Sequence, residues 1–166
     1  MRIEDEVKLD FKDVLIRPKR STLASRKEVS LQRTYTFKHS KRYYQGVPIM
    51  AANMDGVGTL EMASALQTHG MFTCLVKNYT ADDFADTNGI LSGDRFAVST
   101  GTSDSDFERL KSIAERRHLE FICIDVANGY QERFADYVAK VRAEFPTVTI
   151  IAGNVVTADM TQELIL

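Results

Sequence analysis

Apolar residues gather in five short runs that recur along the chain at nearly regular intervals. The runs are rich in β-branched and aromatic residues, as is typical of buried parallel strands. Their centres lie roughly 25 residues apart, which leaves room for a helix between consecutive strands. The pattern predicts strands at 47–51, 71–76, 96–99, 121–125 and 148–152.

Helical spacing of apolar positions separates these runs. Residues three, four and seven apart lie on one helix face, and this pattern predicts helices around 60–66, 107–114, 134–141 and 157–166, with a weaker, shorter one over 81–88. Asp104 and Thr157 are of the types that cap helix amino termini, and Gly70 is of the type that ends a helix.

The alternation of strands and helices predicts an α/β fold with a parallel sheet and helical crossovers. A doubly wound sheet and a (β/α)₈ barrel both fit. The regular spacing and the absence of a glycine-rich GxGxxG turn after the first strand favour the barrel. We therefore expect residues 1–166 to be the amino-terminal part of one TIM-barrel domain, with about five βα units at 47–166 after an amino-terminal segment at 1–46. Within that segment, VSLQRTYTFKH predicts a strand outside the barrel.

Net charge and cysteine content indicate which partners and which redox state of the thiols to expect. The net charge of −2 gives no reason to expect nucleic acid or a membrane as a partner. Cys74 and Cys123 both lie inside apolar runs. We expect reduced core thiols in a cytoplasmic protein, although two cysteines could also pair.

Small and polar residues stand at or just after the end of each predicted strand, at 52–55, 77–78, 99–103, 125–129 and 153–154. The carboxyl ends of barrel strands share one rim, where barrel enzymes carry their chemistry. We expect one rim to hold Asn53, Lys77, Thr100, Asp125 and Asn154. Structural alternatives stay open: the asparagines could bond loop backbone, Lys77 could be solvated, and Asp125 could cap the next helix.

Six segments also resemble a known family. They read FKDVLIRPKRSTLASR, GVPIMAANMD, LVKNY, STGTSD, ICIDVANGY and IIAGNVVT, and together they are similar to the GMP reductase branch of the IMP dehydrogenase superfamily of (β/α)₈ barrels. The dehydrogenase branch usually has different first and fourth strand ends and an inserted regulatory domain. Two departures stand out: Val76 and Asn78 flank the lysine where the family usually has histidines, and Gly56 stands where it usually has threonine.

The resemblance implies reductive deamination of GMP by NADPH, which yields IMP, ammonia and NADP⁺. A cysteine attacks purine carbon 2, ammonia leaves, and hydride reduces the covalent thioimidate. That cysteine and the ligands of an expected K⁺ ion fall beyond Leu166, and no metal site is expected in this chain. The resemblance also implies a homotetramer.

The resemblance assigns roles to residues of this chain. It implies Lys77 as a catalytic residue. For cofactor binding it implies Ser25, Arg26, Lys77, Asp125, Val126 and Ala127. Met54 and Asn154 are expected near the substrate.

Two other functions stay open. One is an IMP dehydrogenase-like enzyme without a regulatory domain. The other is a non-catalytic, nucleotide-binding partial barrel, which should self-associate because both edges of its sheet are unsatisfied.

The missing nucleophile yields a first prediction. The 166-residue chain alone should show no GMP-dependent oxidation of NADPH, because the covalent step has no nucleophile. The decrease of NADPH absorbance measures this directly. Turnover by the purified chain would mean that Cys74 or Cys123 serves as the nucleophile.

Overall fold

The computed structural model describes residue 3, residues 5–84, residue 87 and residues 91–166. The chain divides into two compact units, Met1–Ser30 and Leu31–Leu166. In the first unit every described residue is exposed, and two short 3-10 helices form, η1 at Phe11–Asp13 and η2 at Arg26–Glu28. A third, η4, spans Gly93–Arg95 in the second unit.

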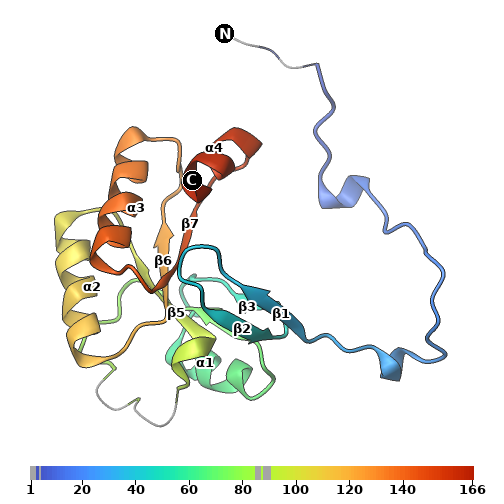
Figure 1. Ribbon diagram of the computed structural model, residues 1–166, viewed down its shortest axis with the longest axis horizontal. Coiled ribbons are helices and arrows are strands. Elements are labelled where there is room, and N and C mark those ends of the chain that lie inside the picture. The colour runs from blue at the N-terminus through green and yellow to red at the C-terminus, as the bar shows by residue number, and fades with distance from the viewer. Residues whose placement is uncertain (1–2, 4, 85–86, 88–90) are drawn as a thin grey trace. The chain divides into compact units, whose positions relative to one another are not determined.

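A five-stranded parallel sheet with the order β3-β4-β5-β6-β7 forms the centre of the second unit (Figure 1). The strands are β3 Met50–Ala51, β4 Phe72–Cys74, β5 Phe96–Thr100, β6 Phe121–Asp125 and β7 Thr149–Gly153. They confirm the five predicted strands and their parallel pairing, with shifts at the boundaries.

The sheet curls strongly. Phe72 on β4 and Phe121 on β6 have ring centroids 5.0 Å apart, although β5 lies between their strands. In a flat sheet these strands would be about 9.6 Å apart. The sheet is therefore part of a barrel wall.

Four helices connect or follow the strands: α1 Leu60–Gln67, α2 Asp104–Arg116, α3 Glu132–Glu144 and α4 Ala158–Ile165. They confirm four predicted helices. Of the weaker helix predicted over 81–88, residues 81–84 form turns and residue 87 is 3-10, while 85, 86 and 88 lie outside the described residues.

One of the two predicted amino-terminal helix caps is right and the other is wrong. Thr157 caps α4 by accepting a hydrogen bond from Met160 N, as expected. Asp104 is not the cap of α2. Ser103 is, because its hydroxyl and the Asp106 carboxylate satisfy each other's backbone N–H groups in a capping box. Gly70, beyond α1, has the positive φ of 69° that suits glycine.

The helices pack on the outward face of the sheet. Side chains alternate between the two faces of a strand, and the outward ones include Leu75, Val98 and Ile122, all at most 2% exposed. They join the buried residues of α2 and α3 in one cluster, among them Leu110, Ile113, Phe134 and Val141. This is the main hydrophobic core.

An antiparallel hairpin faces the inward side of the sheet. It pairs β1 Arg33–Thr36 with β2 Tyr43–Gly46. β1 confirms the strand predicted outside the barrel, whereas β2 was not predicted. Tyr44 of β2 packs edge-on against Phe72 and Phe121, with centroid distances of 6.1 Å to each.

Polar contacts also fix the hairpin turn at the amino ends of the strands. Arg42 pairs with Glu120 at 2.8 Å, and Ser40 hydrogen-bonds Thr149 at 2.7 Å. Through these contacts the hairpin forms the floor of the curled sheet.

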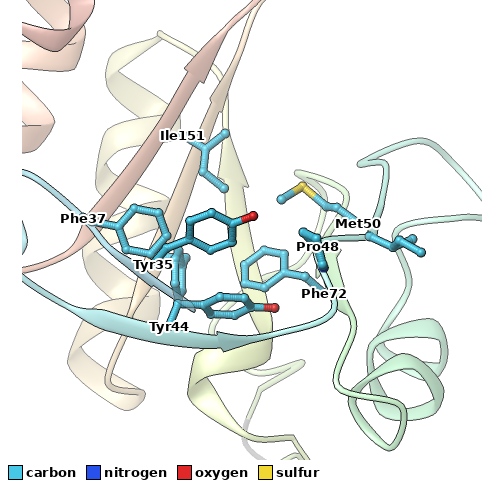
Figure 2. Close-up of a pocket in the computed structure, with 9 residues that line it drawn as sticks. Tyr35, Phe37, Tyr44, Pro48, Met50, Phe72 and Ile151 are labelled. Carbon is cyan, nitrogen blue, oxygen red and sulfur yellow. The ribbon is translucent and has the colours of Figure 1, made fainter. Parts of the chain in front are cut away.

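Beside the hairpin lies an apolar pocket of about 320 Å³, lined by aromatic rings and by Met50 and Ile151 (Figure 2).

A layer of thiols lies above this aromatic floor. Cys74 and Cys123 are both buried and both free, which confirms the expectation of core thiols rather than a disulfide. Cys74 Sγ donates to Met50 Sδ at 3.2 Å. A hydrogen bond with Cys123, together with burial, raises the pKa of the Cys74 thiol, so the thiol stays protonated.

None of the helices in the described part of the chain combines the length and the apolar character that a membrane span requires.

Removing a thiol from this layer should cost stability. Cys74→Ala should lower the free energy of unfolding by about 1 kcal/mol, because it leaves a small cavity next to Met50. Urea unfolding measures the change. Val156→Ala is the control, because Val156 is 91% exposed and should change stability little. Equal stability of the two variants would show that the thiol contributes nothing to packing.

Candidate functional site at the carboxyl rim of the sheet

A polar pocket of about 220 Å³ lies at the carboxyl ends of the strands. Residues after β3 and β4 and at the ends of β5 and β6 line it: Asn53, Asp55, Val76, Lys77, Asn78, Ser99, Thr100 and Asp125. The structure therefore brings together four of the five predicted rim residues. Asn154, the fifth, follows β7 outside this lining.

Strand alternation explains why a buried strand ends in a carboxylate. Along β6, Phe121, Cys123 and Asp125 are two residues apart and share the inward face. Phe121 belongs to the aromatic floor and Cys123 to the thiol layer, and Asp125 is the next inward position. It is the one residue of β6 that is exposed, because the strand reaches the rim there.

A hydrogen bond spans the rim between strands that are not neighbours. Asn53 Nδ2, after β3, donates to Asp125 Oδ2, at the end of β6, at 3.1 Å. The curl of the sheet brings these two ends together. Among the described contacts Asp125 Oδ1 accepts no hydrogen bond, so this pocket-lining carboxylate has an oxygen that can accept from a ligand.

Lys77 supplies a positive charge to the same pocket. It is exposed and lies three residues after the end of β4. The preceding residue is fixed, because Val76 N donates to Gly58 O at 2.9 Å. Gly58 itself has no room for a side chain, since a Cβ there would lie 2.3 Å from Cys74 O. The lysine therefore stands on a rigid base at the pocket edge.

Asp106 is a charged neighbour that the sequence did not single out as a site residue. Although burial opposes it, hydrogen bonds from Ser103 and the nearby charges of Arg109 and Lys77 hold the pKa of the Asp106 carboxyl below its ordinary value. Gly101 makes room for this carboxylate, because a Cβ there would lie 2.5 Å from Asp106 Oδ2. The Ser-x-x-Asp spacing of a capping box was the available signal.

Ser99 belongs to the polar segment 99–103 predicted at the rim, but it was not among the five residues expected to share the site. It is 1% exposed and lines the pocket, and a hydrogen bond with its side chain helps to lower the pKa of the Cys123 thiol. Its predicted neighbour Thr100 is turned the other way, with its hydroxyl 3.4 Å from that of Tyr137 on α3. A period-two count from Val98 would have shown which of the two faces inward.

The loops after β6 and β7 are joined into one wall beside the pocket. Val126 N donates to Gly153 O and Asn154 N donates to Val126 O, each at 2.8 Å, and Gly129 N donates to Asn154 O at 3.0 Å. A Cβ at Gly129 would lie 2.8 Å from Asn154 O. Glycine is needed there for close approach, and Val126 and Asn154 belong to this wall rather than to the pocket lining.

Tyr130 extends this wall to the helix that follows β7. Its hydroxyl accepts from Val156 N at 2.8 Å and from Thr157 N at 2.9 Å. A hydrogen bond with Thr157 and those from the backbone lower the pKa of the Tyr130 phenol. The tyrosine thus helps to satisfy the amino terminus of α4.

The remaining predicted residues lie elsewhere. Ala127 is exposed on the wall, and Met54, in the loop after β3, is 64% exposed. Ser25 and Arg26 belong to the first unit, where Ser25 caps η2 by accepting from Lys27 N at 3.3 Å. Within the described residues, no group of three His, Cys, Asp or Glu side chains gathers to hold a metal ion.

Comparison with known proteins gives consistent matches. Residues 8–166 match the model of the IMP dehydrogenase / GMP reductase domain. A GMP reductase of Photobacterium profundum is 58% identical over 170 residues, and one of Klebsiella pneumoniae is 56% identical; each match covers 100% of this chain and 49% of the relative. The chain thus spans about half the length of the curated relatives it matches.

A solved structure supports the architecture. The crystal structure of inosine 5′-monophosphate dehydrogenase from Legionella pneumophila superposes with a TM-score of 0.77 at 23% identity, covering 93% of this chain and 46% of that one. At this identity the likeness concerns the fold alone: a curled parallel sheet with helices on its outer face.

The Asp106 carboxylate should make stability depend on pH. Its pKa in the folded chain lies below the ordinary value, so its contribution is fully present above about pH 4 and is lost as pH falls through the folded-state pKa. Asp106→Asn should cost about 1 kcal/mol at pH 7, and its difference from the unmodified protein should shrink below about pH 4. Urea unfolding at several pH values measures this.

The matched control is Asp104→Asn on the same helix. The Asp104 side chain is 99% exposed and pairs with Lys140 on the surface, so this variant should change stability by less than about 0.5 kcal/mol. Indistinguishable pH profiles for the two variants would contradict the role given to Asp106.

Proposed function

This chain belongs to the IMP dehydrogenase / GMP reductase family, and we therefore propose that it is the amino-terminal part of an NADPH-dependent GMP reductase. The enzyme would convert GMP into IMP and ammonia. One observation carries the proposal: GMP reductases match all of this chain at 56–58% identity. The proposed fold is a (β/α)₈ barrel in which 47–166 supply the first five βα units and 1–46 an amino-terminal segment.

The rim pocket suits the polar groups of a nicotinamide nucleotide. Lys77 offers a cation, Asp125 a carboxylate with one oxygen held by Asn53, and Ser99 a buried hydroxyl. A carboxamide or a ribose hydroxyl can donate to Asp125, and an anionic or carbonyl oxygen can accept from Lys77. NADPH supplies a hydride when bound.

In this proposal the residues of this chain bind and orient the cofactor and supply a proton to the leaving group. Asp125 would fix the orientation of the cofactor, and Lys77 would hold a ligand oxygen or give a proton to the departing ammonia. Close approach of the ligand would be allowed by Ala127, and Val126 would add its backbone to the cofactor contacts. Asn154 and Met54 are proposed near the purine. The nucleophilic cysteine is proposed to come from beyond Leu166.

Other features of the proposal come from the family. Ser25 and Arg26 would contact the cofactor, the protein would be cytoplasmic, and the enzyme would be a homotetramer. A K⁺ ion would take its ligands from beyond this chain, and no step above depends on it. GMP and IMP are the proposed substrate and product.

A pair of assays tests the proposal on the full-length enzyme. GMP with NADPH should give oxidation of NADPH and release of ammonia in equal amounts. IMP with NAD⁺ should give no NADH. The reverse result would identify an IMP dehydrogenase-like enzyme. Nucleotide binding without either reaction would identify a non-catalytic barrel.

Lys77 is the sharpest site prediction. In the full-length enzyme, Lys77→Met should preserve folding and lower kcat at least about 100-fold, the lower end for loss of a general acid. Lys77→Arg should restore little, because a guanidinium does not release a proton near neutral pH. Steady-state kinetics with GMP and NADPH measures both variants.

Lys111→Met is the matched control. Lys111 lies on α2 and pairs with Glu108, so its loss should leave kcat unchanged. Near-normal turnover of Lys77→Met would assign Lys77 to the solvated surface and leave Asp125 as the remaining candidate.

A further inference from the structure

Arg109 is not among the residues that line the pocket, but it donates hydrogen bonds to two segments that do. Its guanidinium donates from Nη1 to the carbonyl of Tyr79 and from Nη2 to the carbonyl of Ser99, each at 2.8 Å. Tyr79 follows Lys77 by two residues in the loop after β4, and Ser99 is the inward residue near the end of β5. One side chain of α2 therefore ties the lysine loop to the neighbouring strand.

The loop that carries Lys77 is held on both sides of the lysine. On the amino side, Val76 N donates to Gly58 O at 2.9 Å. On the carboxyl side, Tyr79 is fixed twice, by Arg109 at its carbonyl and by Leu60 N, which donates to its hydroxyl at 3.1 Å. Only two residues, Lys77 and Asn78, lie between these anchors.

The partial burial of Arg109 explains why its guanidinium needs both carbonyl acceptors. Arg109 is half-buried, and loss of solvent lowers the pKa of its guanidinium, with Asp106 and Tyr137 acting in the opposite direction. A cation taken out of water needs acceptors for its N–H groups, and here two backbone carbonyls supply them. A planar fork reaches both carbonyls at once, which a lysine ammonium does not reproduce.

We propose that Arg109 is a positioning residue for the rim site: through the carbonyls of Tyr79 and Ser99 it fixes the loop that presents Lys77. The inference rests on the proposed role of Lys77 in the reductase. Arg109 would act without lining the pocket itself. Its loss frees the Tyr79 carbonyl and leaves the carboxyl-side anchor of Lys77 to the hydrogen bond from Leu60 N. A displacement of about 1 Å at a catalytic group can lower turnover about 100-fold.

Arg117, at the carboxyl end of the same helix, provides a matched control variant. Arg117, the C-cap of α2, is also half-buried and also makes two hydrogen bonds, to Thr87 Oγ1 at 2.8 Å and to Leu91 O at 2.6 Å. Burial lowers the pKa of its guanidinium too. These contacts precede β5, at the end of the sheet opposite the rim, so Arg117→Met should cost stability without affecting the reaction.

The test uses the full-length enzyme with Arg109→Met, Arg109→Lys and Arg117→Met. We expect both Arg109 variants to lower kcat for GMP reduction at least about tenfold, with Arg109→Lys failing to rescue because the fork is lost. KM for GMP should change less than kcat, since the substrate contacts are untouched. Arg117→Met should keep kcat.

A double-mutant cycle separates positioning from general destabilisation. If Arg109 acts through Lys77, then Arg109→Met should lower kcat further by less than about twofold in a Lys77→Met background. Should Arg109→Met fail to fold, the cycle is run with Arg109→Lys. Additive losses, or an unchanged kcat in both Arg109 variants, would overturn the proposal. An inactive unmodified enzyme would instead overturn the proposed function.

Discussion

The parallel pairing of five curled strands is the constraint on which the rest of this chain depends. Parallel strands place all their carboxyl ends at one edge, and alternation gives each strand one inward series. On β6 that series runs from Phe121 through Cys123 to Asp125, from aromatic floor to thiol layer to polar rim. The carboxylate stands at the rim because the same register that buries the phenylalanine carries it there.

Local pattern was enough to predict the main framework. The five strands of the parallel sheet and four helices follow from apolar periodicity. The polar residues at the strand ends predicted a shared rim, where Asn53, Lys77 and Asp125 line one pocket. The pattern was less informative where structure depends on partners distant in the chain. β2, at Tyr43–Gly46, forms because Tyr44 packs on Phe72 and Phe121, and neither contact can be read from four residues.

In the site, too, some roles can be predicted from local sequence and others depend on distant partners. A strand end identifies Lys77, but nothing in the sequence near Arg109 shows that its guanidinium reaches Tyr79 and Ser99. Asp104 and Ser103 are both good capping types, and their difference rests on which oxygen meets Asp106 N. Roles that depend on the direction of one side chain need coordinates, whereas roles that depend on position along a strand do not.

The hydrogen bond from Asn53 to Asp125 couples ligand affinity to the shape of the sheet. It joins the ends of β3 and β6, which other strands separate, so it closes only while the wall is curved. A ligand that competes for Asp125 Oδ2 would weaken its hydrogen bond with Asn53. Because linkage is reciprocal, a change in curvature that broke this hydrogen bond would alter the affinity for such a ligand by the same factor.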